Sequence, residues 1–178
     1  MRSATTSQLA ALEYVILGLV HGPTYAYEMF QHFSQDLPLG MLWHLKQSHL
    51  YALLSQLERE GYVAASVASQ GTRPPRRILR LTDQGYTALE RWLTTPVKHG
   101  RDMRQEFLAK LYFTAQRGSE VVRALVAVQA TATRRWRDEV QAQLDASTQP
   151  YRRLVLLYRL GQIDATLTWL EECTAIIY

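Results

Sequence analysis

Hydrophobic residues near the start of the chain recur every three or four positions. In residues 7–20 they form one stripe, made of Leu9, Leu12, Val15, Ile16, Leu19 and Val20. This spacing predicts an amphipathic helix. His21, Gly22 and Pro23 should end it, because proline disfavours helical geometry in the residue before it. We expect Thr24 to cap a second helix, with apolar contacts from Tyr27, Met29, Phe30 and Phe33.

A second stripe predicts the third helix. It consists of Leu50, Leu53, Leu54 and Leu57, with Ser48 placed to cap the helix and Gly61 placed to end it. Residues 38–43, just before it, are short and apolar and predict a loop or brief turn. The period then changes, and residues 62–67 and 76–81 predict two strands joined by a turn at 71–75. Thr82 should cap a fourth helix that ends at Thr95 and Pro96.

Beyond Gly100 the pattern predicts helices alone: residues 104–115, 119–147 and a last helix after Pro150. The last helix carries a stripe with alternating steps of four and three, namely Leu156, Leu160, Ile163, Leu167, Leu170, Thr174 and Ile177. Such a stripe is typical of a coiled coil and needs a partner helix. Residues 119–147 match it poorly, because Gln129, Thr133 and Arg137 interrupt their apolar phase. Residues 119–147 could cover part of the stripe, but we expect a homodimer held by the first helix, with its wide apolar face, and the last helix.

Together these elements predict a mainly α fold with a small two-stranded β-wing. Residues 1–96 would form a winged helix-turn-helix domain, and residues 97–178 a helical, coiled-coil-like dimerisation domain. A composition of 47% hydrophobic and 20% charged residues is that of a folded domain. The sequence shows no apolar run of about 18 residues and no charged leader followed by an apolar segment, so we expect a cytoplasmic location and no membrane partner.

Charge and chemistry favour a binding protein over an enzyme. A net charge of +4 suits a polyanionic partner. The five histidines include no pair at i, i+4 spacing, and Cys173 is the sole cysteine, so the sequence predicts neither a metal site nor an intramolecular disulfide. It also lacks a glycine-rich phosphate loop and a nucleophile elbow, so we expect no catalysis and no cofactor.

Two polar segments are candidates for DNA contact. Residues 62–82 hold four arginines and no acidic residue: Arg73, Arg76, Arg77 and Arg80. Arginine suits phosphate, and a hairpin can lie along a minor groove; the alternative is a solvated basic edge that prevents strand aggregation. The start of the third helix offers Lys46, Gln47, Ser48 and His49 to a major groove. Alternatively, Ser48 is only a cap and Lys46 only a surface charge.

Three strings resemble the PadR family of bacterial repressors: LEYVILGLVHGPTYAYE, QSHLYALLSQLEREGYV and RRILRLTDQG. The resemblance extends over roughly residues 10–92. It is most specific in the middle string, at Ser48, Leu50, Tyr51, Leu54, Leu57, Glu58, Gly61 and Val63. The sequence departs from the family's common residues at Tyr25, Ala26 and Leu79. The resemblance implies a winged helix-turn-helix repressor whose helical C-terminal half forms a homodimer.

The expected partners are therefore double-stranded DNA with two-fold symmetry and a second copy of the chain. The aromatic residues of the C-terminal half could also line a pocket for a small-molecule effector of unknown identity, although core packing is the favoured explanation for them. We expect the DNA-binding residues to be Tyr25, Lys46, Gln47, Ser48, His49, Tyr51, Arg73, Arg76 and Arg77. Tyr51 could instead be a core residue. The expected dimer interface is Leu156, Leu160, Ile163, Leu167, Leu170 and Ile177. Two other functions fit the pattern: a winged-helix protein-interaction module and a small-molecule-binding helical protein.

Overall fold

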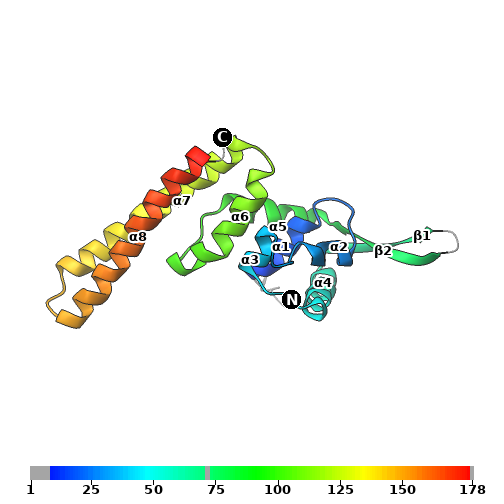
Figure 1. The fold of residues 1–178 in the computed structure, drawn as a ribbon, viewed down its shortest axis with the longest axis horizontal. Coiled ribbons are helices and arrows are strands. Elements are labelled where there is room, and N and C mark those ends of the chain that lie inside the picture. The colour runs from blue at the N-terminus through cyan, green and yellow to red at the C-terminus, as the bar shows by residue number, and fades with distance from the viewer. Residues whose placement is uncertain (1–8, 71–72, 177–178) are drawn as a thin grey trace, which may run out of the picture. The chain divides into compact units, whose positions relative to one another are not determined.

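The computed structural model describes residues 9–70 and 73–176 (Figure 1). It forms two compact units, Met1–Trp92 and Leu93–Tyr178. The elements that begin in the first unit are α1 (Ala11–Leu19), α2 (Ala26–Gln31), α3 (Pro38–Leu42), α4 (Gln47–Arg59), β1 (Val63–Gln70), β2 (Arg73–Leu81) and α5 (Asp83–Thr94). The second unit holds the 3-10 helix η1 (Gly100–Arg104), α6 (Glu106–Ala115), α7 (Ser119–Asp145) and α8 (Pro150–Ile176). The predicted fold class, mainly α with a two-stranded wing, is confirmed; the domain boundary at residues 96 and 97 stays a prediction.

The core of the first unit forms around α4, which packs against α1, α2 and β1. The leucines Leu50, Leu54 and Leu57 are buried on one face of α4, as their spacing predicts. From α1, Val15, Ile16 and Leu17 are fully buried. The ring of Tyr14 stacks on that of Trp92 with centroids 5.2 Å apart. The leucine face of α4 is thus packed in the core, and its opposite face is open to solvent.

Two helix starts differ from their prediction. Helix α4 begins at Gln47 with Lys46 as its N-cap residue and no side-chain cap, so Ser48 lies at the second helical position and does not cap the helix. Tyr25, not Thr24, is the N-cap residue of α2. The Thr24 hydroxyl instead donates to Glu28 Oε2 at 3.3 Å, and its backbone pairs with Leu79. In both cases the helix keeps its apolar face, but the N-cap residue lies two residues before the expected one in α4 and one residue after it in α2.

Residues 38–42, expected to be a loop or turn, form the short helix α3. Pro38 occupies its first turn, where a fixed φ favours the helix and the missing N–H is not needed. The predicted C-terminus of α4 and the predicted N-terminus of α5 are correct. Gly61 ends α4 with φ +82°, a conformation that glycine adopts without strain, and the Gly85 amide donates to Thr82 Oγ1 at 3.1 Å.

The wing is an antiparallel hairpin whose register pairs Val63 with Leu81 at its base and Gln70 with Arg73 toward its tip. Both strands are longer than predicted, and Pro74 and Pro75 lie in β2 although we expected them in the turn. A two-stranded hairpin has two edges, where a proline that lacks an N–H is tolerated. The side chains of residues 68–76 lie outside the description.

The second unit is built on α7 and α8, which lie side by side along their length (Figure 1). Leu156 and Leu160 pack with Leu144 and Val140 of α7. Further along, Leu170 and Cys173 pack in a cluster that includes Val122, Leu125 and Val126. The stripe of α8 is therefore covered within one chain: Leu156, Leu160 and Leu170 are 2%, 7% and 1% exposed, and Ile163 and Leu167 are half-buried. Ile177 lies outside the described residues.

Helix α7 covers this stripe because the polar residues that interrupt its apolar phase bond within the unit. Gln129 Oε1 accepts a hydrogen bond from the Val97 amide at 2.8 Å, and the Thr133 hydroxyl donates to the Gln129 carbonyl at 2.9 Å. Arg137 pairs with Asp164 of α8, with 2.7 Å between Nε and Oδ1. Buried polar groups that find such partners are tolerated in a core. Helix α7 therefore covers more of the stripe than its interrupted apolar phase predicts, and the dimer interface expected at this stripe stays a prediction.

Candidate nucleic-acid interface

The N-terminal turn of α4 presents polar side chains to solvent. Lys46, Gln47, Ser48 and His49 are all exposed, and this turn holds no acidic residue. The first turn of any helix leaves backbone N–H groups without helical partners and carries the positive end of the helix dipole. Because Ser48 is not used as a cap, its hydroxyl is free of that role. Together these groups form a compact surface of hydrogen-bond donors that suits an anionic partner.

The outer face of α4 continues at three- and four-residue steps through Tyr51, which is exposed, and Ser55 and Glu58, which are half-buried. Tyr51 is 45% exposed, so it does not have the core role that the sequence left open. The Ser55 hydroxyl donates to the Tyr51 carbonyl at 2.9 Å. Sequence reasoning missed Ser55, although its position four residues after Tyr51 is the signal that could have found it.

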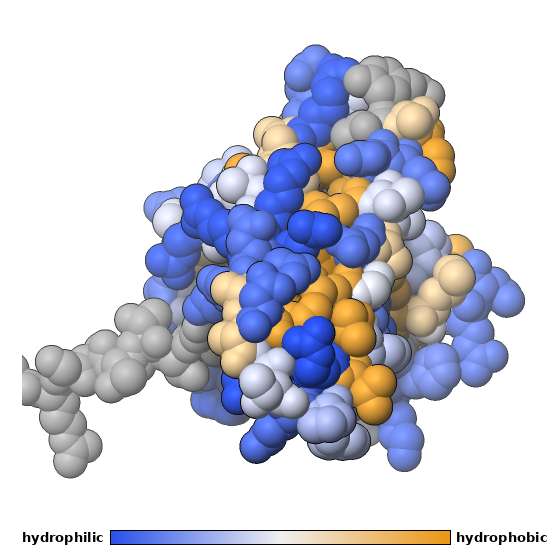
Figure 2. All heavy atoms as spheres, turned by 90° about the vertical axis from the view of Figure 1, so that its left-hand side faces the viewer, coloured by the Kyte–Doolittle hydropathy of each residue, from blue (hydrophilic) through white to orange (hydrophobic). Residues whose placement is uncertain are grey.

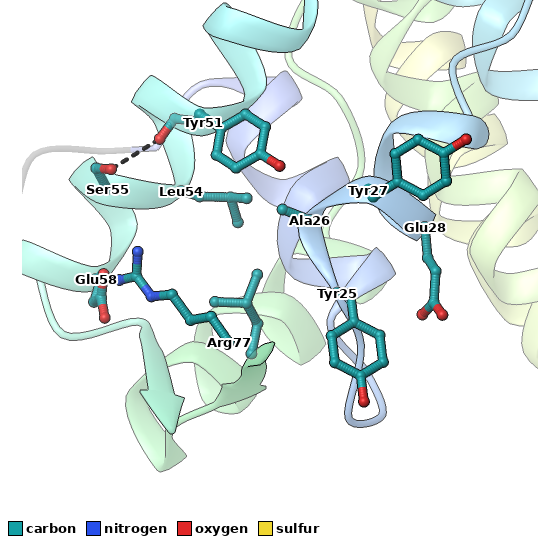
Figure 3. Close-up of a pocket in the computed structure, with 10 residues that line it drawn as sticks. Tyr25, Ala26, Tyr27, Glu28, Tyr51, Leu54, Ser55, Glu58 and Arg77 are labelled. Atoms are coloured by element: carbon teal, nitrogen blue, oxygen red, sulfur yellow. Dashed lines mark hydrogen bonds and ion pairs between the residues drawn. The ribbon is translucent and has the colours of Figure 1, made fainter. Parts of the chain in front are cut away.

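Beside this face lies an open cavity of about 380 Å³ between α2, α4 and β2 (Figure 3). Leu54 and Leu79 are buried at its wall, and Tyr25, which is half-buried, also lines it. Figure 3 shows Tyr51 pointing from α4 toward α2, and Arg77 reaching from β2 to Glu58 on α4. The structure thus brings together three of the predicted DNA-binding residues, Tyr25, Tyr51 and Arg77, around one hollow.

The arginines of the wing do not share one environment. Arg77 forms an ion pair with Glu58, whereas Arg80 is exposed and lies opposite Ala64. Arg73 and Arg76 belong to β2, but their side chains are among those outside the description. The wing sequence contains no acidic residue; the carboxylate that meets it comes from α4, and sequence spacing does not reveal such a pairing.

Within residues 9–70 and 73–176, no group of three His, Cys, Asp or Glu side chains could hold a metal ion. None of the helices described there is long and apolar enough to cross a membrane.

Two family models match the chain, one on each unit. The transcriptional regulator PadR-like family matches residues 15–91, and the model named virulence activator alpha C-term matches residues 103–177. Residues 15–91 form a PadR-like family domain. The resemblance stated from the three sequence strings is thereby confirmed, and so is the prediction of a transcriptional regulator rather than an enzyme.

Of two similar proteins, one aligns with this chain over nearly its whole length and the other over about half. The negative transcriptional regulator PadR of Bacillus subtilis (strain 168) is 28% identical, over 95% of this chain and 98% of that protein. The probable transcriptional regulator Rv1176c of Mycobacterium tuberculosis is 26% identical over 51% of this chain and 47% of its own length. Bacillus subtilis PadR in complex with operator DNA is a similar solved structure, with 26% identity, coverage of 96% and 99%, and a TM-score of 0.47. The same protein in complex with p-coumaric acid aligns over 94% and 99%, with 25% identity and a TM-score of 0.43.

Proposed function

We propose that this chain is a repressor that binds a two-fold symmetric DNA operator as a homodimer. The observation that carries the proposal is the exposed, non-acidic N-terminal turn of α4 in a unit that also carries a basic wing. In winged helix-turn-helix proteins such a turn enters the major groove. The Bacillus subtilis relative is named a negative regulator and has been solved with operator DNA, and we extend that role to this chain. A protein with this role acts in the cytoplasm.

We assign the contacts by side-chain chemistry. Gln47, Ser48 and His49 can hydrogen-bond base edges, which distinguish base pairs in the major groove. Lys46 and the hydroxyls of Tyr25 and Tyr51 suit phosphate oxygens, which position the protein without reading sequence. On the wing, Arg73, Arg76 and Arg80 are assigned to the DNA backbone.

The function is tested by titrating the protein into labelled DNA from the intergenic region beside its gene and into a random duplex of equal length. Fluorescence anisotropy at about 50 to 200 mM salt should show binding that weakens by a factor of about 10³ to 10⁵ if six to ten phosphates are contacted. Lys46→Ala should weaken both duplexes similarly, whereas Gln47→Ala should reduce the preference for the specific one. Failure to bind any duplex at low salt would remove the proposal.

We place the dimer surface on the second unit, on a face of α8 that α7 does not cover. Its large apolar side chains are Tyr151, Leu154, Leu157 and Tyr158, which are 79%, 65%, 51% and 67% exposed. Figure 2 shows apolar side chains among polar ones at this end of the molecule. Exposed apolar residues that gather on one helix face mark an interaction surface. A second copy docked there would present two α4 helices to half-sites about 34 Å apart, one turn of DNA.

The small-molecule effector that the sequence leaves open is retained as part of this proposal. The relative solved with p-coumaric acid makes that compound the first to test. It should release the chain from its operator in the anisotropy assay if the two proteins share an effector. An unchanged DNA affinity would show that this chain responds to a different molecule or to none.

A further inference from the structure

The two faces of the wing have different roles. Directly opposed residues of an antiparallel pair share a face, and side chains alternate along each strand. The register opposes Val67 to Arg77 and Ala65 to Leu79, so Arg77 lies on the same face as Leu79. Leu79 is 4% exposed, which identifies this face as the one that packs on the core. Arg80 lies on the other face. Arg77 therefore sits on the inner face of the wing, toward the helices.

The partner of Arg77 is Glu58, in the last turn of α4, whose carboxylate accepts a hydrogen bond from the guanidinium. Figure 3 shows the two side chains meeting beside the cavity. The base of the hairpin has separate ties: Leu79 N donates to Thr24 O at 2.9 Å, and the Thr82 hydroxyl donates to Gly61 O at 2.6 Å. Among the described side-chain and backbone hydrogen bonds that join the wing to the rest of the unit, the Arg77–Glu58 pair is the one nearest the tip.

Because of this position, the pair restrains a part of the wing that lies beyond the contacts at its base. From Leu79 to Arg73 the strand extends about 20 Å, at about 3.3 Å per residue, and from Arg77 to Arg73 it extends about 13 Å. The pair thus shortens the unsupported arm by about a third. Glu58 and Arg77 are 31% and 55% exposed, and an ion pair so accessible to water adds little to stability. The pair instead fixes the orientation of the wing relative to α4, because it joins the two elements that must contact DNA together.

We propose that the Arg77–Glu58 pair is a strut that fixes the angle between the wing and α4, so that Arg77 acts as a positioning residue and not as a DNA contact. This inference rests on the proposed function of the same surface. The pair also neutralises a carboxylate that lies on the outer face of α4 with Tyr51 and Ser55. Without Arg77, that carboxylate would repel the DNA backbone.

The variant Glu58→Gln, which removes the charge of Glu58, tests whether Arg77 is a strut or a phosphate contact. The two roles predict changes of opposite sign in DNA affinity. If Arg77 contacted phosphate, Glu58→Gln would free its guanidinium and remove a negative charge, so DNA affinity would rise or stay unchanged. If the pair is a strut, the same change releases the wing, and DNA affinity falls by about tenfold, the size of a coupling between contacting residues. Glu60→Gln, at the C-cap of α4, removes the same charge without touching Arg77 and should leave DNA affinity unchanged.

Two further measurements complete the test. Arg77→Gln should weaken binding more than Glu58→Gln does, because it also leaves the Glu58 carboxylate unpaired, whereas loss of a phosphate contact would lower the salt slope by about 0.9. The exchanged pair Glu58→Arg with Arg77→Glu should restore most of the lost affinity. Tighter binding by Glu58→Gln, a lower salt slope in Arg77→Gln, or no recovery in the exchanged pair would each overturn the strut.

A measurement without DNA keeps this inference separate from the proposed function. Amide hydrogen exchange of β1 and β2 in the free protein should become faster in Glu58→Gln and Arg77→Gln but not in Glu60→Gln, because local opening follows the loss of local ties. Unchanged exchange in all three variants would overturn the strut. If the wild-type chain bound no duplex while exchange still responded to the pair, the strut would stand and the proposed function would fail.

Discussion

Helices α4 and α8 both bury a leucine stripe, but their opposite faces differ. In α4, Leu50, Leu54 and Leu57 face the core, and the outer face carries Ser48, Ser55 and Glu58. In α8, Leu156, Leu160 and Leu170 face α7, and the outer face carries Leu154, Leu157 and Tyr158. Helix α4 thus has one apolar face and one polar face, whereas α8 has two apolar faces. The difference indicates that α4 presents its open face to a polar ligand, and α8 presents its open face to protein.

The largest effect should come from making the outer face of α8 polar. We expect Leu154→Glu with Tyr158→Glu to convert the dimer to a monomer, because a docked copy would bury two unpaired carboxylates. Operator affinity should fall by at least about a hundredfold, since two linked half-site contacts exceed one by about 10² to 10⁴. Multi-angle light scattering gives the mass. Ala142→Glu with Gln143→Glu adds the same charges to exposed positions of α7 and serves as the control. A dimer that survives the α8 changes would place the interface elsewhere.

The next effect distinguishes the inner stripe of α8 from its outer face. In the monomeric double variant, Leu156→Ala should still lower the free energy of unfolding by about 2–5 kcal/mol, because Leu144 and Val140 of the same chain cover Leu156. Leu57→Ala in α4 should cost a similar amount and serves as the reference. Urea unfolding followed by circular dichroism measures both. A cost below about 1 kcal/mol for Leu156→Ala alone would mean that another subunit covers this residue.

These comparisons show how far the sequence predicts the molecule. The order of elements, the stripe of α4 and the ends set by Gly61 and Thr82 all follow from local patterns. Local patterns report that a face is buried, and they do not report what covers it. The role of α7 as that cover depends on Gln129 reaching the Val97 amide, 32 residues away in sequence. No periodicity encodes such a contact.

The same limit applies to the candidate site. Its exposed residues at the start of α4 could be predicted, because they precede a leucine stripe and follow no apolar phase of their own. The pairing of Arg77 with Glu58 could not be predicted, since it joins a strand to a helix 19 residues earlier. Four wing arginines therefore looked alike in sequence, although the strand register separates Arg77 from Arg80.

The two units also differ in the polarity of their cores. Among the described residues, Glu13 is the buried charged or polar residue of the first unit, whereas the second unit buries Lys110, Thr114, Gln129, Thr133 and Ser147. The Lys110 ammonium donates to the Thr95 carbonyl at 2.7 Å and pairs with Glu106, with 3.1 Å between Nζ and Oε1. Only 1% of its side chain is exposed. This buried cation gives the second unit a pH response that an apolar core lacks.

The smallest expected effect tests that response. Burial lowers the pKa of Lys110 below its usual 10.5, and Glu106 only partly opposes this shift. Below the lowered pKa, the folded and unfolded chains both hold the proton. Between the lowered pKa and 10.5 the unfolded chain binds more protons, so the free energy of unfolding should rise with pH through this window.

Lys110→Met removes the titration. Burial also raises the pKa of the Cys173 thiol, but that group titrates in both proteins and cancels from their difference. The stability of the wild-type chain minus that of Lys110→Met, measured by urea unfolding at successive pH values, should therefore increase toward pH 10.5. A difference that decreases with pH would mean that the ion pair with Glu106, and not burial, governs Lys110.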